Sequence, residues 1–170
     1  TSRVSFRLGS LLMARPRAIP SMPGICISRM AIATGSWSAL ACVSACKAEI
    51  EHFIAGTTPR PPGTTVYGGI VPHAGWHFSG KAAARVFFLA AKARQPQVVC
   101  VFGGHLGGNS PPLLVADDAW ETPLGNLLLA TEFYQPLAKR LPLREESPGD
   151  NTIEVQMPFV KYFFPQAKVL

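Results

Sequence analysis

The run VYGGIVPHAGWHFSGKAAARVFFLAAKARQPQVVCVFGGH, residues 66–105, contains two short apolar stretches on either side of an Ala-rich one. The stretches at 66–71 and 98–102 have the length and the continuous apolar character of buried strands. Residues 80–93 between them have helical length, with Ser79 as the expected N-cap. This β–α–β order predicts an α/β fold with a mostly parallel sheet and helices on both faces.

One histidine follows each predicted strand. His73 comes after residues 66–71, and His105 comes after residues 98–102. The carboxyl ends of neighbouring parallel strands meet at one edge of a sheet, about 4.8 Å apart, where two imidazoles can bind one ion. The pattern therefore predicts a metal site at His73 and His105, although a catalytic site usually has about three protein ligands. Solvated or hydrogen-bonded loop histidines are the alternative interpretation.

Other residues near these histidines have two interpretations each. His77 lies one helical turn beyond His73, so it either replaces one ligand or packs in the loop beside Trp76. Glu154 either caps a helix or lies near the site. We assign Trp76, His77 and Glu154 to the pocket or to the residues that surround the metal. The glycine-rich residues 103–108 lack the Gly-Lys-Ser/Thr ending of a phosphate loop, which argues against nucleotide binding.

Hydrophobic periodicity indicates further elements along the chain. Apolar residues at three- and four-residue steps predict a helix over residues 39–55, capped by Ser38 and ended by Gly56. Asn151, with Glu154 three residues later, forms a capping box for a last helix. The other expected elements are strands at 113–116 and 126–130, a helix at 131–141 with Pro136 inside it, and a strand that begins at 168–170.

Composition restricts the class of protein. Of the 170 residues, 48% are hydrophobic and 15% are charged, which suits one folded domain and excludes a disordered chain. No apolar run reaches the roughly 18–20 residues of a membrane-spanning helix, so we expect no membrane partner. The four cysteines form no CxxC pair, which favours a reducing compartment, and we expect a cytoplasmic protein.

The net charge of +6 is unevenly distributed along the chain. Residues 1–48 contain six Lys and Arg and no acidic residue, so the whole excess lies there. A nucleic-acid-binding face would carry its basic residues on the folded part, so we expect no nucleic-acid partner. Residues 1–30 lack apolar periodicity, and we expect a disordered, targeting or non-native tail there, before an α/β domain at 31–170.

Three motifs resemble the Memo-like protein family. Residues 71–80, VPHAGWHFSG, are similar to the family's PHAGY…SG segment. Residues 121–125, ETPLG, resemble its TPLG turn, and residues 153–159, IEVQMPF, resemble its SIEVQLPF helix. The motifs occur in the family's order, and the resemblance extends from about residue 35 to residue 170. The family includes the B component of the bacterial and archaeal AmmeMemoRadiSam system.

The resemblance implies a fold like that of the class III extradiol dioxygenases, which hold non-haem Fe(II) with two His and a carboxylate. His73 and His105 match the family's first two metal-site histidines. By resemblance, the third ligand and an Asp/His pair lie beyond Leu170, so we expect the C-terminal half of the fold to be missing. The implied cofactor is a divalent transition metal, with Fe(II) as the first expectation, Cu or Zn as alternatives, and none where the site is vestigial.

Three positions depart from the family pattern. Trp76 stands in place of the family's Tyr, residues 102–105 (FGGH) in place of GPSH, and Asn151 in place of the His of HSIE. The first and last changes remove groups that could transfer a proton.

Two functions follow from these observations. The first is a metal-dependent, dioxygenase-like oxidoreductase with an unknown small-molecule substrate, whose pocket Trp76 and Phe78 would wall. The second is a non-enzymatic binding or adaptor protein for a protein partner, with a vestigial metal site.

Overall fold

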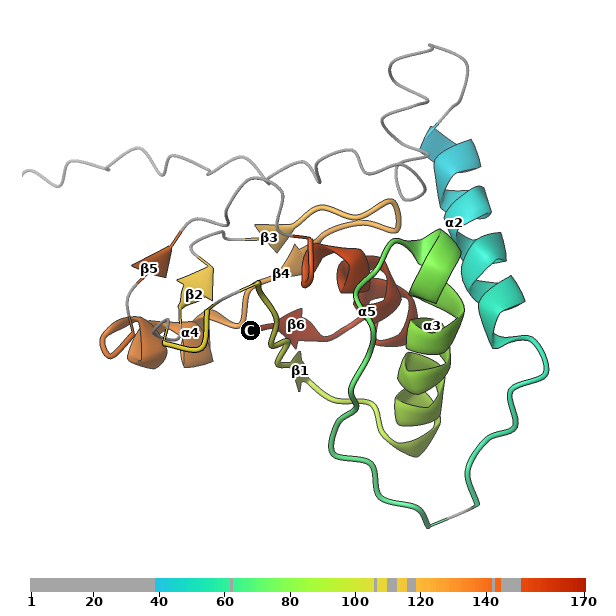
Figure 1. Ribbon diagram of the computed structural model, residues 1–170, viewed down its shortest axis with the longest axis horizontal. Helices are drawn as coiled ribbons and strands as arrows, with labels where there is room; N and C mark the ends of the chain where they lie inside the picture. Colours follow the sequence, from blue (N-terminus) through green and yellow to red (C-terminus); the bar gives the residue numbers. More distant parts are fainter. Residues whose placement is uncertain are drawn as a thin grey trace, which may run out of the picture.

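The computed structural model describes residues 39–61, 63–105, 107–109, 113–115, 119–141, 143–144 and 151–170 of the chain. The tail predicted at 1–30 and the predicted cap Ser38 lie outside these residues. Two long helices, α2 (Ala39–Ile54) and α3 (Trp76–Ala93), stand together on one side, with short strands and shorter helices beside them (Figure 1). This mixture of helices and small sheets confirms the α/β class. Within the described ranges, no helix is both long and apolar enough to cross a membrane.

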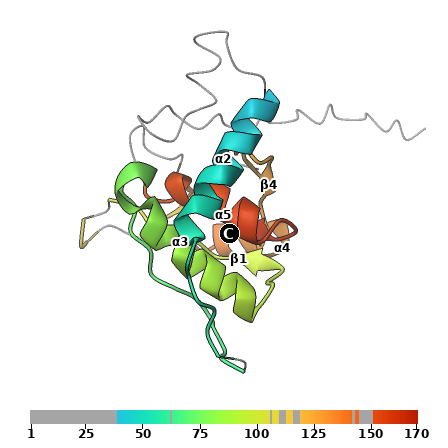
Figure 2. The same cartoon turned by 90° about the vertical axis from the view of Figure 1, so that its right-hand side faces the viewer.

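α2 packs on α3 through one apolar face, and the two helices lie side by side in both views (Figures 1 and 2). Phe53 contacts Trp76 with ring centroids 5.9 Å apart, and a Cβ on Gly80 would come 2.5 Å from Phe53 Cε2. A side chain at position 80 would therefore force the Phe53 ring to shift. Gly56, at φ +71°, ends α2 as the sequence predicted. The buried α2 residues recur at three- and four-residue steps: Cys42, Cys46, Ile50 and Phe53.

α3 begins one turn earlier than predicted. Its N-cap is Gly75, without a side-chain cap bond, so the expected cap at Ser79 is wrong. Ser79 lies inside the first turn, where its hydroxyl donates to the carbonyl of Ala74 at 2.7 Å. The extra turn carries Trp76, which is buried against the core, and this burial outweighs the local capping preference of Ser79.

The prediction of a strand at residues 66–71 is also wrong. These residues pair with no strand in the part of the chain that the structure describes, and Ile70 is 97% exposed. A strand needs a neighbour whose backbone groups complete its hydrogen bonds. The expected neighbour, β1 (Val98–Val99), pairs in parallel with β6 (Lys168–Val169). An apolar run can have strand composition and still lack a partner.

The described strands are short and form three pairs, two of them parallel. A parallel bridge between Leu129 and Val169, with a hydrogen bond from Ala130 N to Val169 O at 2.8 Å, joins β4 to β6. The order β1–β6–β4–β3 therefore follows from these contacts. Besides β1–β6, the pairs are parallel β2 (Leu114–Val115) with β5 (Leu143–Arg144), and antiparallel β3 (Ala119–Trp120) with β4 (Leu127–Leu128).

The last helical segment starts with a 3₁₀ turn. This turn, η1 (Glu154–Gln156), is followed by α5 (Met157–Phe163), so the element begins two residues later than a cap at Asn151 requires. Its N-cap residue is Ile153, which makes no side-chain cap bond. On α5, Phe159 stacks on Trp76 with centroids 4.3 Å apart, and α5 thereby packs against α3. The remaining helix is α4 (Thr131–Ala138), with Pro136 inside it as expected.

Candidate metal centre

The structure brings the two predicted histidines together. The ring centroids of His73 and His105 lie 5.1 Å apart with an interplanar angle of 76°. Both residues are exposed to solvent. His73 follows the unpaired segment at 66–71 rather than a strand end, so its loop reaches the site without the predicted strand.

The separation of the two rings fits one shared ion. Two imidazoles that bind a tetrahedral ion at about 2.0–2.1 Å have ring centroids about 5 Å apart. The observed 5.1 Å agrees with this value, and neutral imidazole nitrogen is a common ligand for Zn, Cu and Fe. Within the described residues, no three His, Cys, Asp or Glu side chains form a metal-binding group. The described part of the chain therefore brings together two histidines and no third side chain of these types beside them.

The loop that carries His73 is fixed by η1 and α3. The Gln156 side-chain amide donates from Nε2 to the carbonyl of Pro72 at 3.0 Å. The Trp76 indole N–H donates to the carbonyl of Val155 at 2.9 Å. These two hydrogen bonds flank His73 in the sequence, one on each side, so they restrict the position of its backbone.

The loop that carries His105 packs against the residues just before η1. A Cβ on Gly103 would lie 2.8 Å from both Thr152 Oγ1 and Ile153 Cγ1, which is closer than real contacts allow. Gly104 has φ +117°, a conformation that side chains with a Cβ rarely adopt. The two glycines before His105 are therefore required by this backbone path.

The three residues that the sequence assigned to the pocket or to the surroundings of the metal differ in how deeply they are buried. Trp76 is buried in the core, where its indole stacks on Phe159. Glu154 is also buried, in η1. His77 is exposed, with its ring 5.1 Å from that of Phe78.

His77 also influences the electrostatics between α3 and α2. Burial raises the pKa of Glu49 on α2, and the charges of His52 and His77 partly offset this effect. His77 is thus close enough to α2 to act on a partly buried carboxyl group there. The structure brings His73 and His105 together, and it places His77 where its charge acts on α2.

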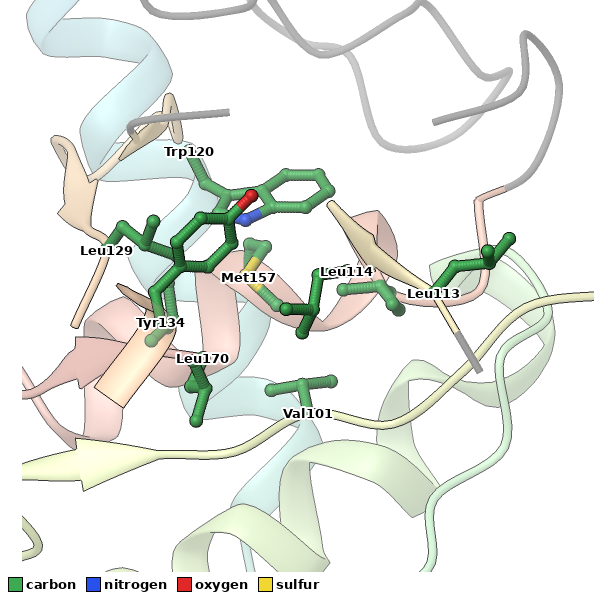
Figure 3. Close-up of a pocket in the computed structure, with 10 residues that line it drawn as sticks. Val101, Leu113, Leu114, Trp120, Leu129, Tyr134, Met157 and Leu170 are labelled. Atoms are coloured by element: carbon green, nitrogen blue, oxygen red, sulfur yellow. The ribbon is translucent and has the colours of Figure 1, made fainter. Parts of the chain in front are cut away.

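An apolar hollow of about 70 Å³ lies at the ends of β1 and β6 (Figure 3). Val101 and Leu170, which follow these two strands, line it together with Ile153, whose side chain packs toward Gly103. Figure 3 shows Trp120, Tyr134 and Met157 on its other sides. Ligands of α/β proteins commonly bind beyond the carboxyl ends of parallel strands, so the hollow is in a suitable place for the apolar part of a ligand.

Sequence reasoning missed the supporting residues of this centre. Gln156 and Thr152 belong to the run 152–156, which the apolar pattern predicted as part of an ordinary amphipathic helix. The sequence does contain one signal for Gln156, because this polar amide lies between the apolar residues Val155 and Met157. A buried amide generally has a hydrogen-bonding role.

A family model described as Memo-like protein matches residues 29–170. The MEMO1 family protein of Caldivirga maquilingensis is 34% identical over 106 residues, which are 59% of this chain and 38% of that protein. The MEMO1 family protein of Methanopyrus kandleri is 32% identical over 108 residues, 61% of this chain and 38% of the relative.

A third relative extends the match. The MEMO1 family protein of Pyrobaculum aerophilum is 31% identical over 128 residues, 71% of this chain and 46% of that protein. The chain thus spans less than half the length of each of these curated relatives. Because the family model covers most of the chain, and its range includes both histidine loops and η1, the chain belongs to the Memo-like protein family.

Proposed function

We propose that His73 and His105 bind one divalent transition metal ion. The observation that carries this proposal is the 5.1 Å separation of their ring centroids, on loops that η1 and its preceding residues hold in place. Both rings are exposed, so an ion can enter without rearrangement of the core. We further propose Fe(II) as the ion, with Cu and Zn as alternatives, and a third ligand outside the described residues.

We also propose a fold related to that of the class III extradiol dioxygenases, and a metal-dependent oxidoreductase function. Family membership and the two-histidine centre support this proposal. The bound ion would supply a Lewis-acid site with open positions for a substrate oxygen. The hollow beside Val101 and Ile153 would hold the apolar part of the substrate and exclude water from it. Trp76 would not transfer a proton, since its N–H already donates to Val155 O.

A metal titration tests the shared site. The wild-type chain should bind about one Zn²⁺ per chain in calorimetry, and His73→Ala and His105→Ala should each weaken binding by more than about tenfold, because one imidazole holds the ion poorly. His52→Ala is the matched control, since it removes an exposed histidine from α2. Elemental analysis of the same proteins, purified anaerobically, identifies the native ion. Equal affinity in the wild type and in both site variants would exclude a shared site.

A second candidate function is protein binding without catalysis. Large apolar side chains near both histidines are almost fully exposed, with Ile70 at 97% and Phe102 at 94%, each three residues before a histidine. If these side chains form one contiguous apolar patch, that patch would serve as an interaction surface. The double variant His73→Ala/His105→Ala separates the two candidates in the native cell. If the protein is a metal enzyme, the double variant should lose its activity in the cell. If it is a binding protein, the double variant should keep that activity.

A further inference from the structure

Gln156 is a polar residue in an apolar part of the core. Its side chain is only 2% exposed, and it lies between the buried residues Val155 and Met157. Its Nε2 donates to the carbonyl of Pro72 at 3.0 Å, across 84 positions of the chain. Its Oε1 is buried and has no hydrogen-bond partner among the described residues. The amide nitrogen therefore has a hydrogen-bond partner among the described residues, and the amide oxygen does not.

This arrangement is a poor one if stability alone is considered. A buried polar atom without a partner is destabilising, and replacing a polar pair by apolar groups of similar shape is often nearly neutral. A hydrocarbon side chain at position 156 would avoid the cost at Oε1. The amide, unlike a hydrocarbon, provides a hydrogen-bond donor for the carbonyl of Pro72, which is one residue before His73.

The same short segment also limits the position of the other histidine. Thr152 and Ile153 pack so closely on Gly103 that no Cβ fits there, two residues before His105. Residues 152–156 thus contact the loops of both histidines, one by hydrogen bonding and the other by close packing. No regular sheet pairs residues 66–71 with β1, so residues 152–156 are a connection between the two loops that does not involve strand pairing.

We infer that Gln156 is a positioning residue, which holds the backbone at His73 so that its ring stands beside that of His105 at the separation of one shared ion. The purpose of this positioning rests on the proposed metal function. The positioning itself does not require an ion, so it can be tested in the metal-free protein.

The test uses the ring protons of the histidines in the whole chain. The sequence has four histidines, so a protein labelled only at histidine gives a simple NMR spectrum. The metal-free wild type should show a cross-relaxation signal between the rings of His73 and His105, which lie 5.1 Å apart. Gln156→Met, which keeps the volume but loses the donor, should lose this signal while its melting temperature stays close to that of the wild type. Its affinity for Zn²⁺ should fall by about 10- to 100-fold.

Two further variants control the experiment. Thr122→Val removes another buried side-chain donor to a carbonyl, Thr122 Oγ1 to Gly125 O at 2.6 Å, in the turn between β3 and β4. It should keep both the ring signal and the affinity. Gln156→Glu has the same shape as the wild type but cannot donate once it is ionised, so it should lose the signal at high pH. It serves as the second variant if Gln156→Met does not fold.

The outcomes separate the two proposals. A ring signal that persists in folded Gln156→Met or in Gln156→Glu at high pH, or that is absent from the wild type, overturns the positioning inference. A wild-type protein with the ring signal but without Zn²⁺ binding overturns the metal function, and the ring signal of the variants then decides the inference alone.

Discussion

At the residue scale, Trp76 joins two segments that are 79 positions apart, because its indole N–H donates to the carbonyl of Val155 across the core. The ring also stacks on Phe159, so one side chain connects the start of α3 with both η1 and α5. The resemblance to the family suggested a pocket position for Trp76. The structure gives it a packing role, which a larger ring with a single N–H donor suits.

Trp76→Phe should destabilise the chain, and the cost should come mainly from the hydrogen bond. Phenylalanine keeps a stacking surface for Phe159, but it leaves the buried carbonyl of Val155 without its donor. We expect the free energy of unfolding in urea to fall by about 1–3 kcal/mol. Trp120→Phe, at a half-buried position in β3, should have a smaller effect. An unchanged unfolding free energy in Trp76→Phe would show that the hydrogen bond contributes nothing to stability.

The sequence predicted which two histidines meet, but it did not predict what holds them. His73 and His105 could be paired because each follows a short apolar run, a pattern that is local and can be read directly. The contacts that fix their loops, such as Gln156 with Pro72, join residues 84 positions apart and leave no periodic signal. Contacts between a side chain and a distant backbone carbonyl depend on the tertiary fold alone.

At the element scale, helices were easier to predict than strands. α2 ends within one residue of its predicted end because its apolar steps and Gly56 are properties of the helix itself. The run at 66–71 failed as a strand because strand formation also depends on a neighbour, and composition cannot supply one. β6, by contrast, was predicted at the correct residues and does have a neighbour in β1.

α2 contains a thiol that should make stability depend on alkaline pH. Burial, and then the nearby charge of Glu49, raise the pKa of Cys46 from 9.0 to about 12. Because the folded pKa is the higher one, the stability linked to the thiol is complete below pH 9 and is lost as pH rises toward 12. The loss amounts to up to about 4 kcal/mol.

Urea unfolding of the wild type and Cys46→Ala between pH 8 and about pH 11 measures this linkage. The stability of the wild type should fall more steeply with pH than that of Cys46→Ala. Cys100→Ala, which removes an exposed thiol, should follow the wild type. Parallel pH profiles for the wild type and Cys46→Ala would contradict the effect of burial on this thiol.

At the scale of the whole molecule, the excess positive charge of the chain lies toward its N-terminus. Residues from Glu49 onward carry equal numbers of basic and acidic residues, and the excess of six positive charges lies before them. The pI of about 9.5 therefore describes the N-terminal part of the sequence and not the surface around the histidines. Binding to polyanions would be a property of that segment alone.

Deletion of residues 1–30 should abolish binding to polyanions without loss of the fold. The deletion removes five arginines and no acidic residue, so the net charge falls from +6 to +1. Retention on a heparin column at low salt should disappear, because it depends on these cations. The melting temperature should change by no more than about two degrees, since the segment has no apolar periodicity that would pack on a core. A larger drop would show that the segment contributes to the core.

The hydrogen bonds that flank His73 also determine when the centre can form during synthesis. Trp76 requires Val155 as its acceptor, and Pro72 requires Gln156 as its donor, so synthesis has to pass η1 before either hydrogen bond can form. Closing such long loops is slow compared with the formation of α2 and α3, which contact each other over a shorter stretch of sequence. The two histidines are therefore translated early but come together late. An ion bound to one imidazole of the nascent chain would be held only weakly until η1 and α5 had docked.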